Sequence, residues 1–238
     1  MKPSKLRLVV LSLLVIVLPA FGAAPKPPQA AVASAHPLAT RAGMEILAKG
    51  GNAFDAAVAV SAALSVVEPY SSGIGGGGLW LLHRASDGFE TMVDGREYAP
   101  GAARADMYQD KAGNVIEGAS TEGPLSAAIP GAPAALVYMA KKYGRLSLAE
   151  DLAPAIRLAR DGFPLDSRFH EMIAAKLDLL KRWPGAAAVF LDHGDVPPAG
   201  WLLKQPDLAE TFELIAKQGD AGFYEGKRAE QMVDAVRA

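Results

Sequence analysis

The sequence predicts a mixed α/β fold, of the α+β type, that is mainly helical with a few strands. Apolar residues recur at helical spacing at 36–67 and again over most of 134–238. Short apolar runs with strand character lie between these regions, at 79–83 and 89–93. Half of the residues are hydrophobic and the formal net charge is −2, which is typical of a globular protein.

The chain begins with the layout of a secretory signal peptide. Basic residues occupy three of the first seven positions, an apolar stretch follows at 8–18, and small residues come at 20–24. The apolar run is short for a membrane-spanning helix. We therefore expect a signal peptide at 1–24 and no stable membrane anchor after its cleavage.

A proline-rich linker is expected at 25–35 and a single domain at 36–238. The chain has no cysteine, so an exported protein of this sequence relies on its core and not on disulfides. A bacterial periplasmic or secreted location fits that composition best. No basic patch suggests a nucleic-acid partner.

Two helices are expected first. The earlier one covers 36–49 and ends at a pair of glycines. Asn52 is a good N-cap for the next helix, and Asp55 lies at its third position, where a carboxylate favours a helix start. The run 53–67 contains only three polar residues, which predicts a helix that is buried on most sides.

A glycine-rich block at 73–78 precedes the strand expected at 79–83. A hairpin signal at 86–88 joins that strand to the next one, at 89–93. The glycines fit the spacing of a dinucleotide-binding loop, but such a loop follows a strand and opens a helix, and here the order is reversed. We interpret the glycines as allowing close packing where the strand enters the sheet.

The second half is expected to be helical. A loop with one helical turn is predicted at 102–122. Pro133 is suited to the first turn of a helix, and Ser147 with Glu150 forms a capping box. The expected helices are 134–143, 147–160, 169–180, 207–219 and 226–238. The last pattern stops without a C-cap, which suggests a fragment.

Arg96 is the candidate ligand-binding residue. It lies in the block 94–100 (DGREYAP) just after the predicted hairpin. A guanidinium can hold a carboxylate through two parallel hydrogen bonds. The alternative is an ordinary salt bridge to a surface acid. Glu97 either orients Arg96 from behind or faces solvent, and Asp94 has the same two alternatives.

No metal site or cofactor is expected. The four histidines are scattered and show no metal-binding spacing. A Gly-x-Ser-x-Gly elbow is absent, which argues against an ordinary serine hydrolase.

Taken together, several blocks resemble the γ-glutamyltranspeptidase (glutathione hydrolase) family. Those blocks, in chain order, are 40–59, 72–78, 94–100, 142–144, 158–163 and 223–226. The resemblance covers about 30–238 and implies the N-terminal part of a large subunit. It also implies a share of the αββα sandwich of N-terminal-nucleophile hydrolases, here mainly its helical portion with few strands.

The resemblance implies cleavage of the γ-glutamyl amide of glutathione-like substrates and transfer of the acyl group to water or an amine. In the family the nucleophile is the N-terminal threonine of the small subunit, whose free amine serves as its base. No threonine here has the required context, so we expect no catalytic residue in this chain and no activity from it alone. Arg96 is expected to bind the α-carboxylate of the γ-glutamyl group.

Two other functions stay open. A related acylase would act on β-lactam side chains or poly-γ-glutamate. A non-catalytic remnant or assembly subunit would have its nucleophile half encoded elsewhere or lost. Whichever holds, missing strands would leave an exposed apolar face, so association or poor solubility is expected.

Overall fold

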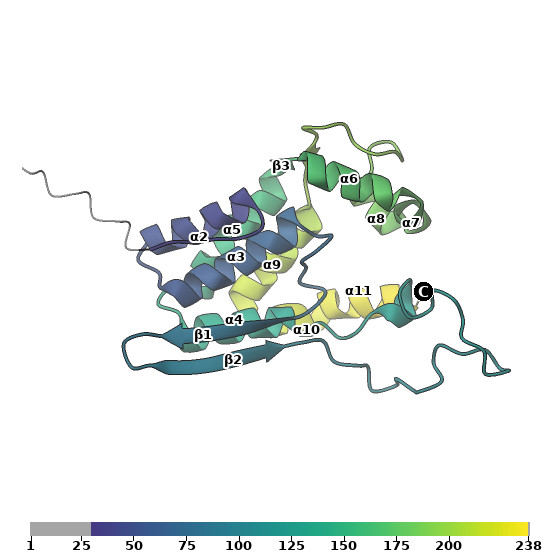
Figure 1. Ribbon diagram of the computed structural model, residues 1–238, viewed down its shortest axis with the longest axis horizontal. Coiled ribbons are helices and arrows are strands. Elements are labelled where there is room, and N and C mark those ends of the chain that lie inside the picture. The colour runs from purple at the N-terminus through teal and green to yellow at the C-terminus, as the bar shows by residue number, and fades with distance from the viewer. Residues whose placement is uncertain (1–29, 238) are drawn as a thin grey trace, which may run out of the picture. The chain divides into compact units, whose positions relative to one another are not determined.

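The computed structural model describes residues 30–237, and all the helices and strands named below lie within the unit Val32–Ala238 (Figure 1). The signal peptide expected at 1–24 and the first part of the linker, 25–29, lie outside the described residues. Within 30–237, no helix combines the length and apolarity that crossing a membrane requires. The extent of the domain, 36–238, stays a prediction.

A helical layer is formed by four helices that pack against one another (Figure 1). Its members are α2 (Pro37–Ala48), α3 (Ala53–Val67), α5 (Leu148–Asp161) and α9 (Pro206–Gln218). Helix α3 is buried along most of its length, as its few polar residues predicted. The predicted caps are also confirmed, because Asn52 and Asp55 form one capping box and Ser147 and Glu150 form another.

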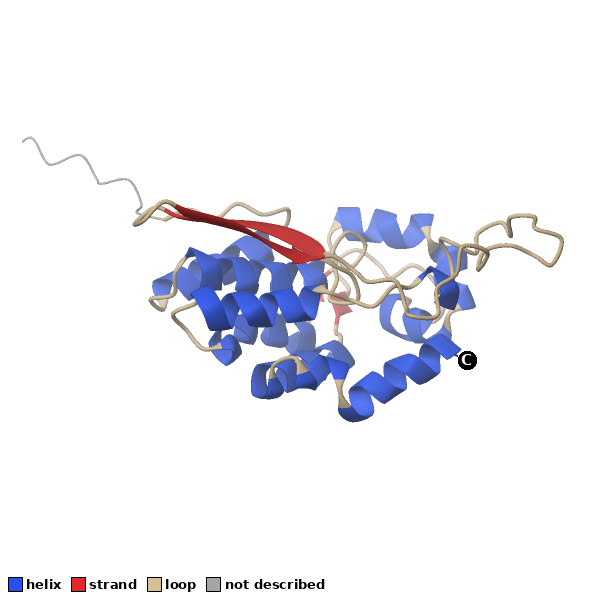
Figure 2. Ribbon diagram, turned by 90° about the horizontal axis from the view of Figure 1, so that it is seen from below, coloured by secondary structure: helices blue, strands red, loops and turns tan. Residues whose placement is uncertain are grey.

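The predicted hairpin consists of β1 (Gly78–Arg84) and β2 (Phe89–Gly95), paired antiparallel from Gly78↔Gly95 to Arg84↔Phe89. One face packs on the helices: Leu82 and Val93 are buried, and Trp80 Nε1 donates a hydrogen bond of 3.0 Å to Ser61 Oγ in α3. Figure 2 shows the hairpin lying across the helices.

Helix α4 (Ala132–Tyr143) supports the hairpin and follows the short helix η1 (Pro124–Ser126). Turns occupy most of 102–122, as predicted. The last two helices are α10 (Ala221–Tyr224) and α11 (Gly226–Arg237). Helix α11 lies at the position predicted for the last helix. Tyr224 Oη ties this end to α4, since it donates to Pro130 O at 2.7 Å and accepts from Ala134 N at 3.3 Å.

The region between α5 and α9 differs from prediction. A single helix was expected at 169–180, but α6 (Ser167–Ala175) and α7 (Leu177–Arg182) are separate helices, because Lys176 leaves helical geometry with φ −118°. Helix α8 (Pro184–Phe190) and the ribbon of β3 (Phe163–Pro164) with β4 (Leu202–Leu203) were not foreseen. Strands of two residues are too short to leave a sequence pattern.

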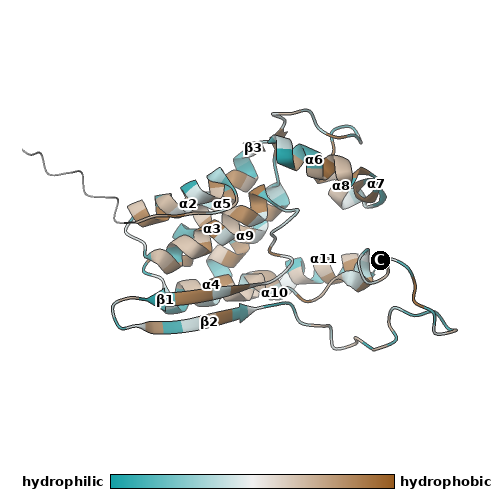
Figure 3. Cartoon of the chain, viewed as in Figure 1, coloured by the Kyte–Doolittle hydropathy of each residue, from teal (hydrophilic) through white to brown (hydrophobic). Residues whose placement is uncertain are grey.

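The α+β class is confirmed. Within 30–237 the strands form two separate two-stranded ribbons and no stacked pair of sheets. Figure 3 shows apolar residues along β1, whose outer face presents Leu79 and Leu81 to solvent. This half-covered hairpin lies next to the candidate site.

Candidate functional site

The glycine block brings one stretch of backbone very close to another. A Cβ at Gly77 would collide with the backbone oxygen of Gly95 and would lie 2.9 Å from both Arg96 Cα and Glu97 N. Backbone atoms cannot move aside as the end of a long side chain can. Position 77 therefore requires glycine for close approach, which agrees with the packing role predicted for the block.

Gly131 approaches the same stretch. A Cβ there would collide with the backbone oxygens of Gly95 and Arg96 and would lie 2.8 Å from Gly95 C. The N–H groups of Gly131 and Ala132 donate to Gly76 O at 3.1 and 3.0 Å. We call Gly77 and Gly131 the glycine clamp, because the backbone at 95–96 approaches both.

Sequence reasoning missed Gly131. Its only local signal is a position between Pro130 and the start of a helix, which also fits an ordinary loop glycine. An isolated antiparallel bridge between Tyr98 and Ile129 continues the contact beyond the clamp, with hydrogen bonds of 3.0 and 2.8 Å. The backbone on both sides of Arg96 is thus fixed.

The Arg96 side chain projects from this fixed backbone into solvent. Its own N–H donates to Asp94 Oδ1 at 3.0 Å, and its side chain is 71% exposed. It lines a surface hollow of about 490 Å³ together with Tyr98, Tyr138 and Tyr224. Within the described residues its one ion-pair partner is Glu97, with 3.5 Å between Nε and Oε2. The guanidinium is therefore available to a carboxylate ligand at the edge of a concave surface.

The Glu97 side chain does not line the hollow beside Arg96 and lines a different cavity. Its side chain is 26% exposed and lines a second, larger cavity, and its Oε2 is buried without a hydrogen-bond donor. It thus does not simply face solvent, and the 3.5 Å approach to Arg96 is compatible with an orienting role. That role stays a prediction, as does the ligand role of Arg96.

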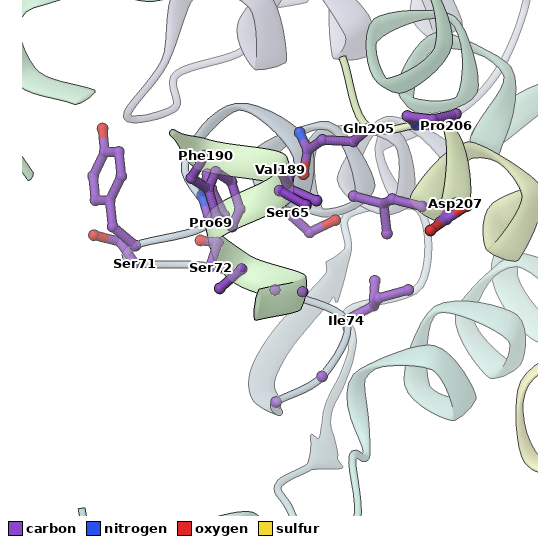
Figure 4. Close-up of a pocket in the computed structure, with 18 of the residues that line it drawn as sticks. Ser65, Pro69, Ser71, Ser72, Ile74, Val189, Phe190, Gln205, Pro206 and Asp207 are labelled. Atoms are coloured by element: carbon purple, nitrogen blue, oxygen red, sulfur yellow. The ribbon is translucent and has the colours of Figure 1, made fainter. Parts of the chain in front are cut away.

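The larger cavity has a volume of about 880 Å³ and lies among three segments (Figure 4). These are the glycine block with the residues before it, helix α8, and the start of α9. Ser72 and Ile74 represent the first segment, Val189 and Phe190 the second, and Asp207 the third. The described lining contains serine hydroxyls but no histidine or threonine, so it offers neither a Ser–His pair nor a threonine nucleophile.

The four threonines of the chain line neither hollow. Thr40 Oγ1 is bonded to Ser34 Oγ at 2.7 Å, and Thr211 Oγ1 donates to Asp207 O within α9 at 2.8 Å. Thr91 belongs to β2 and Thr121 to the turns before η1. None of the four lines the hollow beside Arg96 or the larger cavity.

Two of the four histidines have local structural contacts. His36 Nδ1 accepts a hydrogen bond of 3.1 Å from Leu38 N at the start of α2, and His83 lies 3.0 Å from Glu90 across the hairpin. Across residues 30–237, no three His, Asp or Glu side chains gather in a way that would hold a metal ion.

Solved structures share this fold. The chain of Helicobacter pylori γ-glutamyltranspeptidase matches with a TM-score of 0.83 and 38% identity, over 85% of this chain and 58% of that one. The α+β architecture of this chain is thus that of the γ-glutamyltranspeptidase structures.

Curated relatives agree. The glutathione hydrolase proenzyme of Pseudomonas sp. strain A14 is 43% identical over 87% of this chain and 36% of its own length. The acylase ACY 1 proenzyme of Pseudomonas sp. strain V22 is 40% identical over 87% and 38%, so this chain spans a little over a third of these relatives. A sequence profile described as Gamma-glutamyltranspeptidase matches residues 39–238. The chain belongs to the γ-glutamyltranspeptidase family.

Proposed function

We propose that this chain is the N-terminal part of an exported γ-glutamyltranspeptidase. The complete enzyme would cleave the γ-glutamyl amide of glutathione-like substrates and pass the acyl group to water or an amine. Family membership and the proenzyme relatives support this reading. The nucleophile, an N-terminal threonine, would come from polypeptide other than residues 1–238, because none of the threonines here lies beside Arg96.

The observation that carries the proposal is the placement of Arg96. The backbone of Arg96 contacts two glycines, Gly77 and Gly131, at which any side chain would collide. Its guanidinium lies at the edge of a hollow and has one carboxylate neighbour, Glu97, at 3.5 Å. A fixed backbone that carries an accessible, planar guanidinium group suits bidentate binding of a carboxylate. In the proposed enzyme that ligand is the α-carboxylate of the γ-glutamyl group, and Glu97 supports the arginine.

The test is the variant Arg96→Lys. The variant chain is combined with the nucleophile-bearing part of the Pseudomonas sp. strain A14 relative, and the activity of the completed enzyme is measured. Lysine keeps the charge but loses the fork, and charge-assisted hydrogen bonds contribute roughly 1.5–3 kcal/mol each. We expect KM for a γ-glutamyl anilide to rise by about tenfold or more. Arg104→Lys is the matched control, because Arg104 is also exposed (74%) and ion-paired, in its case to Asp106. An unchanged KM for Arg96→Lys would remove Arg96 from the site.

A second experiment concerns the chain by itself. Purified chain incubated with a chromogenic γ-glutamyl anilide is expected to release no product above buffer, because it contains no suitably placed nucleophile. Release of product would overturn the proposal that the nucleophile lies elsewhere.

A second candidate substrate class follows from the relatives, since an acylase and a glutathione hydrolase match this chain at similar identity. The completed enzyme would then remove β-lactam side chains, or act on poly-γ-glutamate. Arg96 favours substrates whose acyl group carries a free α-carboxylate. Comparing kcat/KM for a γ-glutamyl anilide with that for an acylated β-lactam distinguishes the two.

The remaining alternative is a non-catalytic remnant or assembly subunit. Reading the DNA downstream of the codon for Ala238 tests it. A continuing frame or a neighbouring gene with a Thr-Thr-His motif supports the enzyme, whereas unrelated sequence after a stop supports the remnant.

A further inference from the structure

Two carboxyl groups that the proposed function does not use are buried together inside the helical layer. Asp55 belongs to the first turn of α3, and Asp151 belongs to the first turn of α5. Both residues are 0% exposed. Burying one carboxylate without compensation is costly, and burying two beside each other is more so. Their surroundings therefore have to explain how both are accommodated.

Asp55 is surrounded by backbone donors. Its carboxylate accepts N–H hydrogen bonds from Asn52 at 2.6 Å, from Arg145 at 2.9 and 3.0 Å, and from Leu146 at 3.3 Å. A Cβ at Gly144 would collide with Asp55 Oδ1, so the loop between α4 and α5 lies directly against the carboxylate. These N–H donors compensate for the burial of the Asp55 carboxyl group.

Asp151 has the opposite surroundings. Both of its carboxyl oxygens are buried, and neither receives a hydrogen bond from a protein donor. A protonated carboxyl group, by contrast, is itself a donor and needs an acceptor. The neighbouring acceptor is the Asp55 carboxyl group, which is buried on α3, the helix that packs against α5.

The charges around Asp151 do not favour its ionised form. Burial, then the negative charges of Asp55 and Glu150, and then the hydrogen bond to Asp55 raise the pKa of Asp151 from 3.8 to about 7. The other charged groups on the helices packed against α5 are Arg41 and Glu45 on α2 with Lys49 at its C-cap, Lys141 and Lys142 on α4, and Asp207, Glu210, Glu213 and Lys217 on α9. Among the described residues, none of these forms an ion pair with Asp151.

We propose that Asp55 and Asp151 form a carboxyl pair that holds a single proton between α3 and α5, and that this proton makes the folded state sensitive to pH. The proton resides on Asp151 and is donated to the Asp55 carboxylate. When it is lost, two adjacent buried negative charges face each other across the helix contact. The pair thus couples proton uptake to the association of two helices.

The direction of the pH effect follows from proton binding. Between pH 3.8 and about 7 the folded state keeps the proton on Asp151 while the unfolded state has released it. The unfolded state therefore binds fewer protons, and stability falls as the pH rises through this window. One proton corresponds to about a tenfold fall in the folded-to-unfolded ratio per pH unit.

The test is urea denaturation of the chain at several pH values, with Asp151→Asn beside the wild type. An asparagine amide donates to Asp55 at every pH, as the protonated acid does only below its pKa. We expect the ratio of wild-type to variant folding constants to fall about tenfold per pH unit across the window. Asp178→Asn, at an exposed position in α7, is the control and should parallel the wild type. Parallel curves for Asp151→Asn and the wild type would overturn the proposal.

A second measurement needs no variant to fold. The ¹³Cγ resonance of Asp151 in the wild-type chain reports its ionisation directly. We expect the Asp151 resonance to titrate near neutral pH, because burial and the neighbouring acids raise the pKa of Asp151 to about 7. A resonance for Asp151 that stays in the ionised position down to pH 4 would overturn the proposal, whether or not the γ-glutamyl function holds.

Discussion

The helical layer and the β1–β2 hairpin are held in place in different ways. The layer buries α3 among α2, α4 and α5, so its core is closed by the chain itself. The hairpin is covered on one face only, and its other face exposes Leu79, Leu81 and Met92. The layer thus supplies most of the buried core, whereas the hairpin, which leads directly to Arg96, is held by one packed face and by close backbone contacts at its end. The candidate site lies at the boundary between these two kinds of packing.

The largest effect on folding is expected from Phe212→Ala in the helical layer. Phe212 is fully buried in α9, so truncation leaves a cavity that costs about 3–5 kcal/mol of unfolding free energy. Leu81→Ala, on the open face of the hairpin where Leu81 is 80% exposed, should change stability by less than about 0.5 kcal/mol. Urea denaturation measures both, and similar losses for the two variants would contradict the comparison.

A smaller effect is expected from Gly131→Ala in the glycine clamp. The added methyl group meets backbone oxygens that cannot move aside, so we expect a loss of about 1–3 kcal/mol and a displaced Arg96. Gly101→Ala is the matched control, because a Cβ there meets no atom within 4 Å. Denaturation midpoints and the Arg96 Nε resonance provide the readouts. Equal behaviour of the two variants would mean that the clamp does not constrain the arginine.

A loss of about 1 kcal/mol is expected from Ser147→Ala, which removes the N-cap of α5. Ser147 Oγ accepts from Glu150 N at 3.3 Å, and its own N–H donates to Glu150 Oε2 at 2.9 Å. Ser126→Ala, in the short helix η1, should cost less, because Ser126 Oγ is bonded only to Gly123 O. A larger loss at position 126 than at 147 would contradict the view that the helical layer holds most of the stability.

The smallest change in stability is expected from Leu81→Lys. This variant should nevertheless self-associate less than the wild-type chain. Leu81 pairs with Met92 across the open face, so a charge there interrupts the exposed apolar patch without disturbing the covered face. We expect less light scattering at high protein concentration, with an unchanged denaturation midpoint. Asp178→Asn, which raises the net charge by the same one unit away from the hairpin, controls for net charge. Equal scattering by both variants would show that the open face does not drive association.

The helical layer could be predicted largely from local sequence. The bounds of α3 follow from its near absence of polar residues and from Asn52 and Asp55 at its start. The hairpin follows from two short apolar runs around a turn. In these elements the same residues that set local geometry also set burial, so pattern and structure agree.

Contacts between distant segments were not predictable. Gly131 meets the backbone beside Arg96 although nothing near it in sequence differs from a loop glycine. Asp55 was interpreted only as a residue of the helix start, yet it also binds Arg145 and Leu146. Asp151 looks like any acid in a first turn until its burial is known. Such roles are set by tertiary neighbours, for which a single sequence carries no local signal.

The segment 166–200, between α5 and α9, begins and ends at neighbouring points of the structure, which affects how this chain can vary in length. Leu165 N donates to Trp201 O at 2.8 Å and Gly200 N donates to Leu165 O at 3.1 Å, so the chain leaves and returns through adjacent points. A short turn in place of 166–200 would keep α5 and α9 in position and would expose Tyr70 and Phe163, which now pack against Phe169. One wall of the large cavity can therefore be lengthened, shortened or exchanged by insertion and deletion while the scaffold beneath it stays the same.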